Sequence, residues 1–146
     1  MKHPVAVQLS SCQLDADGHE QRTHNQYQGV WYQQGRSDYL VYHEDGIQTT
    51  LRWDEREWRL FRRGTDLEGW QVFRLGESLE SDLRLSGSLL PLETHTHRLS
   101  DIPTQSGREL QLEYTLYSGP DLLGNFTLVI TLTKLEEDPA RGQSDR

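Results

Sequence analysis

Stretches in which apolar and polar side chains alternate follow one another along most of the chain. Each stretch ends at Gly, Asp or Ser, which are residues that tight turns favour. Alternation with a period of two is typical of a strand with one buried face, whereas a helix repeats every 3.6 residues. No window of about twelve residues shows the helical period, so the pattern predicts an all-β chain and argues against a βαβ architecture.

The clearest local signal is Asp45-Gly46, which separates two alternating segments, residues 39–44 and 47–53. An Asp-Gly pair in this position favours a two-residue hairpin turn, because both turn positions require a positive φ. Gly29 is expected to mark a bulge or bend in a long strand. The expected strands cover residues 5–14, 20–33, 39–44, 47–53, 58–63, 70–75, 79–85, 89–99, 110–116 and 126–132, and residues 100–107 are expected to form a loop.

The last two expected strands carry the most regular pattern. Each has one face of apolar residues, and these residues are predicted to face the core: Leu110, Leu112, Tyr114, Leu116, Phe126, Leu128, Ile130 and Leu132. About eight to ten antiparallel strands joined by short turns protect their edges most simply by closing into a barrel. The sequence therefore predicts one antiparallel β-barrel domain over residues 1–136 and a disordered, acidic and polar tail over residues 137–146.

The charge of the chain limits its partners. Fifteen Lys and Arg stand against 23 Asp and Glu, which gives a formal net charge of -8. The electrostatic field of a negatively charged protein repels phosphate backbones and anionic lipid headgroups. We therefore expect neither nucleic acid nor a membrane surface as a partner. Cys12 is the only cysteine, which excludes an intrachain disulfide and fits a cytoplasmic setting. Residues 9–12 also fit a lipoprotein cleavage box, but they lack the preceding apolar run that export requires.

A set of short motifs spans most of the chain. The motifs are residues 29–32 (GVWY), 39–44 (YLVYHE), 49–51 (TTL), 60–64 (LFRRG), 71–73 (QVF) with Gly76, 92–99 (LETHTHRL), 112–116 (LEYTL) and 124–128 (GNFTL). In order and spacing they resemble the YwiB-like proteins of Gram-positive bacteria, a domain-of-unknown-function family, over roughly residues 4–136. The resemblance implies a calycin-type, lipocalin-like barrel and brings no activity, substrate or catalytic residue with it.

A small barrel is either packed with side chains or holds one small ligand. Arg62 shares its expected strand face with Trp58 and Leu60, so its guanidinium can reach the barrel mouth and bind an anionic group. Aromatic rings often line cavities for apolar ligands. The predicted ligand-binding residues are Arg62, Trp58, Tyr42, Trp70 and Tyr114. The alternatives remain open that the rings fill the interior and that Arg62 pairs with one of the many carboxylates.

Glu93, His95 and His97 alternate along one expected strand and therefore share a face. Imidazoles and a carboxylate can hold zinc or non-haem iron, but no further histidine has a spacing that must converge on them. We interpret the three residues as a solvated outer face and predict neither a metal nor a cofactor. The chain also lacks a Gly-x-Ser-x-Gly elbow and a phosphate-binding glycine loop, so nothing in it points to an enzyme.

Three functional hypotheses follow. The leading one is a non-enzymatic cytoplasmic barrel that binds a small apolar or anionic ligand inside. The second is an interaction or regulatory module with a filled barrel, whose outer surface contacts a protein partner or a second copy of the chain. The third, with the least support, is a metal or haem site that uses His95 and His97.

Overall fold

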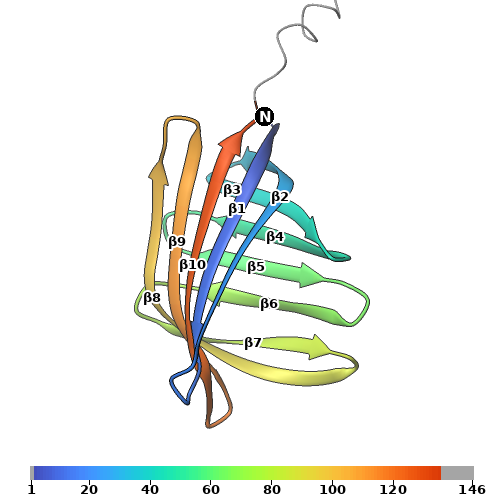
Figure 1. Ribbon diagram of the computed structural model, residues 1–146, viewed down its shortest axis with the longest axis vertical. Coiled ribbons are helices and arrows are strands. Elements are labelled where there is room, and N and C mark those ends of the chain that lie inside the picture. The colour runs from blue at the N-terminus through green and yellow to red at the C-terminus, as the bar shows by residue number, and fades with distance from the viewer. Residues whose placement is uncertain (1, 136–146) are drawn as a thin grey trace, which may run out of the picture.

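The computed structural model describes residues 2–135, which form a closed barrel of ten antiparallel strands (Figure 1). Strands that follow one another in sequence pair with each other, and β1 pairs with β10 to close the barrel. The strands are β1 Lys2–Leu14, β2 Glu20–Gln34, β3 Ser37–Glu44, β4 Ile47–Trp53, β5 Trp58–Arg63, β6 Leu67–Phe73, β7 Ser78–Leu85, β8 Ser88–Pro103, β9 Gly107–Ser118 and β10 Asp121–Lys134. The predicted all-β, calycin-like barrel is confirmed, while the predicted tail over residues 137–146 lies outside the described residues.

The hairpin between β3 and β4 forms where the sequence predicts it. Asp45 and Gly46 have φ values of 47° and 79°, so both turn positions are left-handed as a type I′ turn requires. This turn fixes the register of the hairpin, in which Glu44 pairs with Ile47 and Tyr42 with Thr49. Because side chains alternate along a strand, the register decides which residues face the interior.

Strands β2 to β6 form one wall of the barrel, and its inward side chains lie in three rows across the strands. The row at the closed end consists of Asp38, Trp53, Trp58 and Phe73. The middle row consists of Trp31, Leu40, Leu51, Leu60 and Gln71. The third row consists of Gly29, Tyr42, Thr49, Arg62 and Gly69. The wall thus changes from large apolar side chains at one end to polar and small ones at the other.

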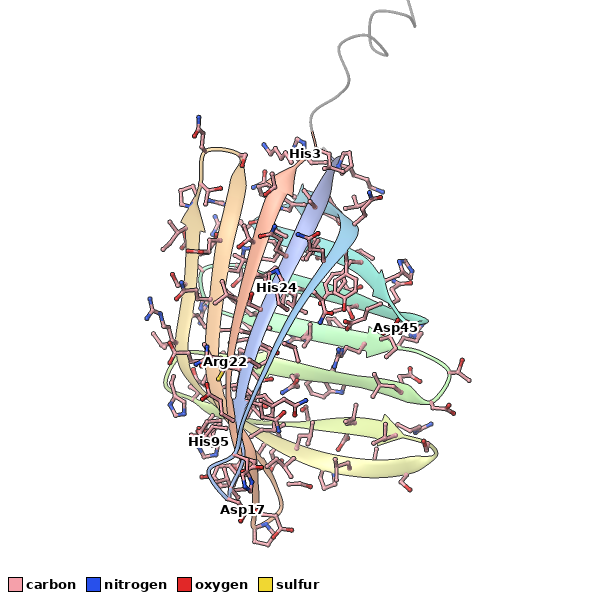
Figure 2. All side chains as sticks on the ribbon, viewed as in Figure 1. His3, Asp17, Arg22, His24, Asp45 and His95 are labelled. Atoms are coloured by element: carbon pink, nitrogen blue, oxygen red, sulfur yellow. The ribbon has the colours of Figure 1, made fainter. Side chains whose placement is uncertain are left out.

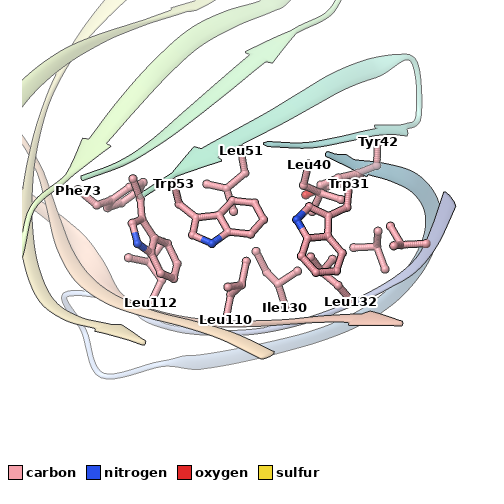
Figure 3. Packing of buried hydrophobic residues seen from close by; sticks show 13 residues of the cluster. Trp31, Leu40, Tyr42, Leu51, Trp53, Phe73, Leu110, Leu112, Ile130 and Leu132 are labelled. Atoms are coloured by element: carbon pink, nitrogen blue, oxygen red, sulfur yellow. The ribbon is translucent and has the colours of Figure 1, made fainter. Parts of the chain in front are cut away.

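The opposite wall comes from β1, β8, β9 and β10, and the two walls pack against each other around the core (Figure 3). Leu110, Leu112 and Leu132 are at most 2% exposed, and Ile130 is also buried. Tyr114 and Leu128 pack against this cluster, and Phe126 stacks on Tyr114 with 5.0 Å between ring centroids. The predicted core face of the last two strands is therefore confirmed, with Leu116 partly buried beyond it.

Tryptophans fill the closed end of the barrel. The indole N–H of Trp31 donates to Asp38, and that of Trp53 donates to Asp101, each over 3.0 Å. Lys134 lies over the Trp31 ring at 5.3 Å from its centroid, which is a cation–π contact. Because both buried N–H groups have an acceptor, the rings can pack here without an unpaired donor.

The other end opens where β2 leaves β3. Within residues 2–135, β2 pairs with β1 along Glu20–Tyr32, but its pairing with β3 begins only at Gly29. A Cβ atom at Gly29 would lie 2.8 Å from the Val41 carbonyl oxygen, so a glycine is needed for this close approach. The register between β1 and β2 continues through Gly29, so β2 has no bulge at this position.

Two local predictions were wrong. Residues 100–103 belong to β8 rather than to a loop, because they pair with β9 as far as Pro103–Arg108. Strand β6 begins at Leu67 and ends at Phe73, which lies earlier than the predicted residues 70–75. The structure also has register shifts at His97 in β8 and at Leu123 in β10, which the sequence pattern did not predict.

Candidate functional site

A cavity of about 270 Å³ lies inside the barrel, between the middle and third rows of one wall and the opposite wall. Apolar residues from both walls form most of its surface. They are Leu9, Leu51, Leu60, Phe73, Leu112, Phe126, Leu128 and Ile130. The polar lining residues are Ser11, Thr23, Asn25, Tyr42, Glu44, Thr49, Arg62, Gln71 and Tyr114. Thr23 and Asn25 are exposed and lie on the part of β2 that does not pair with β3, so the polar side of the cavity is its mouth.

An ion pair stands at this mouth. Nη2 of Arg62 lies 2.6 Å from Oε1 of Glu44, and Oγ1 of Thr49 donates to the same oxygen over 3.4 Å. The Glu44 side chain is only 12% exposed, whereas that of Arg62 is 42% exposed. A charge-assisted hydrogen bond in a partly buried place is stronger than the same contact on the surface.

The backbone register explains how the two charged groups meet. Tyr42, Thr49 and Arg62 are cross-strand neighbours on β3, β4 and β5. Thr49 is small and 1% exposed, so the long Arg62 side chain can extend over it to reach Glu44 at the end of β3. The ion pair thus spans three strands and depends on the register that the Asp45-Gly46 turn sets.

Tyrosines flank the ion pair and the apolar part of the cavity. Tyr42 stacks on Tyr27 with 5.3 Å between centroids, and Tyr114 contacts Phe73 and Phe126 at 5.0 Å each. Burial, followed by the nearby Glu44 carboxylate, raises the pKa of Tyr42 to about 12. Burial likewise raises the pKa of Tyr114 to about 12, although Arg62 and a hydrogen bond with Gln71 oppose this.

These tyrosines predict a loss of stability at alkaline pH. The folded protein holds both phenol protons more tightly than the unfolded chain, whose tyrosines titrate near the ordinary pKa of 10.0. Their contribution to the free energy of unfolding is therefore complete below pH 10 and falls as the pH rises to about 12, by on the order of 3 kcal/mol each. Urea unfolding at pH 9 and pH 11 should show a smaller decrease for Tyr42→Phe and Tyr114→Phe than for the wild type. Equal decreases would contradict this explanation.

The structure brings three of the five predicted ligand-binding residues together at the cavity: Arg62, Tyr42 and Tyr114. Trp58 faces inward but is 3% exposed and packs in the core at the closed end. Trp70 lies on the outer face, where it pairs with Phe61 across β5 and β6 and is 39% exposed. The prediction that Trp70 lines the barrel interior was therefore wrong, because Gln71 and Phe73 are the inward residues of β6.

Sequence reasoning missed Glu44, the carboxylate of the cavity. Alternation along β3 places Glu44 on the same face as the buried Leu40 and Tyr42, so its inward direction could have been found. Its position two residues before Gly46 also indicates the end of a strand, where a barrel mouth lies. Arg62 lines the cavity, as one of the two alternatives predicted. It also pairs with a carboxylate, as the other predicted.

Glu93 and His95 lie on the outer face of β8, because they alternate with buried residues (Figure 2 labels His95). Leu92, Thr94 and Thr96 are the buried residues of this strand. Nε2 of His95 lies 3.6 Å from Glu93, but His97 sits at the register shift and its Nε2 lies 2.7 Å from Oγ1 of Thr115. The strand therefore does not bring Glu93, His95 and His97 together as three ligands.

A different group of metal-ligating side chains lies at the turn after β1. Asp15, Asp17 and His19 are the three residues within 2–135 whose ligand atoms come within 4.8 Å of one another. Oδ1 of Asp15 accepts hydrogen bonds from the backbone N–H groups of Asp17 and His19. These hydrogen bonds lower the pKa of Asp15 and explain the arrangement as a turn.

A second hollow, of about 420 Å³, lies at the closed end of the barrel. Its rim carries charges of both signs, including Arg36, Asp54 and Asp101. Trp53 and Trp58 form its floor but are 1% and 3% exposed, so little apolar surface is accessible from it. The interior cavity is the better candidate site because it combines accessible apolar walls with a polar mouth.

Comparison with known proteins places the barrel in a family. The model of the family described as "Domain of unknown function (DUF1934)" matches residues 7–130, which run from β1 into β10. The chain belongs to the DUF1934 family. The motifs predicted a YwiB-like domain of unknown function, and this prediction is confirmed.

The DUF1934 fold is also found in a solved structure. The crystal structure of the ywiB protein from Bacillus subtilis matches with a TM-score of 0.78, and the match covers 92% of this chain and 94% of that chain. The two sequences are 22% identical, so the comparison establishes the shared fold alone. No curated protein matches the chain. Residues 2–135 include no helix that could span a bilayer.

Proposed function

We propose that this DUF1934 barrel is a non-enzymatic protein that binds one small, partly apolar molecule in its interior cavity. The observation that carries the proposal is the cavity itself: about 270 Å³ stays open inside a barrel whose closed end is packed with tryptophans. This volume lies just below the range of roughly 300–1,000 Å³ that is typical of ligand pockets, which indicates a small ligand. A ligand of this size would bury its apolar part between Leu60, Phe73 and Leu128.

The polar groups of the cavity favour binding over catalysis. Glu44 already accepts hydrogen bonds from Arg62 and Thr49, so it is held as a structural partner rather than free to take a proton from a substrate. Cys12 is equally unsuited to nucleophilic attack, because a hydrogen bond to Glu20 raises the pKa of its thiol. A single, unactivated cysteine supports the expected cytoplasmic setting.

Filling the cavity should weaken the binding of an uncharged apolar probe. N-phenyl-1-naphthylamine becomes fluorescent in apolar surroundings, and we expect the wild type to bind it. Leu128→Trp and Leu60→Trp add bulk to the cavity from opposite walls, so each should weaken probe binding by at least about tenfold. The measurement is a fluorescence titration on variants whose circular dichroism and thermal unfolding show that they are folded.

Phe61→Trp is the matched control, because it adds bulk to the outer face, where Phe61 is 42% exposed. Its dissociation constant for the probe should stay within about twofold of the wild-type value. Probe binding that both cavity variants retain, or that the wild type lacks, would refute an interior binding site.

A second candidate function rests on the outer face. Phe61 and Trp70 are neighbours there and are 42% and 39% exposed, and such apolar surface can mark a contact with a protein partner or a second copy of the chain. Probe binding that is lost in Trp70→Ala and kept in Leu128→Trp would favour this interaction module over the interior site.

A further inference from the structure

The charged side chains that line the cavity neutralise each other. Among residues 2–135, the charged residues that line it are Arg62 and Glu44, and their closest atoms are 2.6 Å apart. Glu44 is 12% exposed and also accepts a hydrogen bond from Thr49. The positive charge that could attract an anion is therefore already matched from inside the protein.

An anionic ligand would have to displace Glu44 from Arg62. The displaced carboxylate would remain largely buried without its partner, which is costly for a charged group. It would also lie close to the ligand carboxylate that replaced it, and like charges in a partly buried site repel each other. The burial of Glu44 therefore works against carboxylate ligands even though an arginine stands at the mouth.

The cavity mouth offers hydrogen-bonding groups to uncharged ligands. Thr23 and Asn25 line the cavity, carry uncharged polar side chains and are exposed. A hydroxyl or carbonyl group of a ligand can form hydrogen bonds with these side chains. Such a ligand leaves the Glu44–Arg62 ion pair undisturbed.

We propose that the Glu44–Arg62 pair makes the cavity selective for uncharged amphipathic molecules, with an apolar body and a hydroxyl or carbonyl end, and against carboxylates. This inference rests on the proposed binding function. It assigns to Glu44 the role of a specificity residue: the carboxylate occupies the guanidinium that would otherwise bind an anionic headgroup.

The test compares two probes with the same apolar body, 1-octanol and octanoate, each displacing N-phenyl-1-naphthylamine. For the wild type we expect 1-octanol to bind at least about tenfold more tightly than octanoate. Glu44→Gln keeps the shape of the side chain and releases the Arg62 charge, so it should tighten octanoate binding by about tenfold or more and change 1-octanol binding by less than about threefold.

Two control variants distinguish the effect of the Glu44–Arg62 pair from the effect of the protein's net charge. Glu80→Gln removes one negative charge on β7, outside the cavity lining, and should leave the ratio of octanol to octanoate affinity unchanged. The double variant Glu44→Gln, Arg62→Met should lose the gain in octanoate affinity, because the guanidinium that receives the carboxylate is gone.

The possible failures are distinguishable. A wild type that binds neither the dye nor any probe refutes the binding function itself. A wild type that binds octanoate as tightly as 1-octanol refutes the specificity role of Glu44 and leaves the binding function intact. A folded Glu44→Gln variant with unchanged octanoate affinity has the same meaning. Should Glu44→Gln not fold, the wild-type affinity ratio still decides the matter.

Discussion

Trp53→Ala is expected to destabilise the barrel by about 3–5 kcal/mol, the range for removing a large buried aromatic side chain. Trp53 is 1% exposed and lies in the inward row at the closed end, between Asp38 and Trp58. Its N–H also donates to Asp101, so the substitution removes a hydrogen bond together with the packing. Because tryptophans close this end of the barrel, the variant should also admit solvent into the core.

Urea unfolding followed by circular dichroism measures this effect. Trp70→Ala is the matched control, since Trp70 is 39% exposed on the outer face, and it should cost about 1 kcal/mol or less. A Trp53→Ala variant that unfolds at the same urea concentration as Trp70→Ala would show that the closed end is not packed as described.

Gly107→Ala is expected to destabilise the barrel by about 1–3 kcal/mol through overcrowding, the range for extra methyl groups forced into a packed site. A Cβ atom at Gly107 would clash with the backbone carbonyl oxygen of Leu132, so β9 and β10 must separate. These strands pair there through Gly107 and Thr133, beside the fully buried Leu132. The strain falls on backbone atoms, which cannot rotate away as a side chain can.

The same unfolding experiment tests this second prediction, with Ser106→Ala as the control one residue earlier. Ser106 is exposed, and the hydrogen bond that it accepts from Lys134 uses its backbone carbonyl, so the control should stay within about 0.5 kcal/mol of the wild type. A neutral Gly107→Ala would mean that the strands do not approach as closely as the structure shows.

The barrel could be predicted from the sequence because its signals are local. The Asp45-Gly46 turn needs two left-handed residues, and only a few residue pairs supply them. The alternation in β9 and β10 is regular because these strands face the core along most of their length, with Leu110, Leu112 and Leu132 fully or almost fully buried. The family resemblance followed from motifs on β2 to β6 and on β8 to β10.

The inward face of β6 could not be predicted with the same rules. Trp70 and Val72 alternate with Gln71 and Phe73, so the apolar period points to the outer face as readily as to the inner one. The register with β5 decides the question: Phe73 pairs with the buried Trp58, and this places Gln71 inside and Trp70 outside. Alternation alone does not reveal which face a barrel turns inward.

The end of β8 was missed for a similar reason. Asp101 and Pro103 read locally as loop residues, yet the backbone continues to pair with β9 and Asp101 accepts the Trp53 hydrogen bond. That bond joins residues 48 positions apart in the chain, which no local pattern indicates. The Glu44–Arg62 pair has the same character, because its geometry depends on the register of three strands.

Native mass spectrometry tests most directly the claim that the barrel holds a small ligand. The protein is purified gently from its own host, and its native mass is compared with the denatured mass of the same sample. We expect the native mass to exceed that of the chain by a small, reproducible amount that is absent after denaturation and in Leu128→Trp. That difference would also give the mass of the bound molecule. A native mass equal to that of the bare chain, in the wild type and in the cavity-filled variant alike, would contradict the proposal that the barrel holds a ligand.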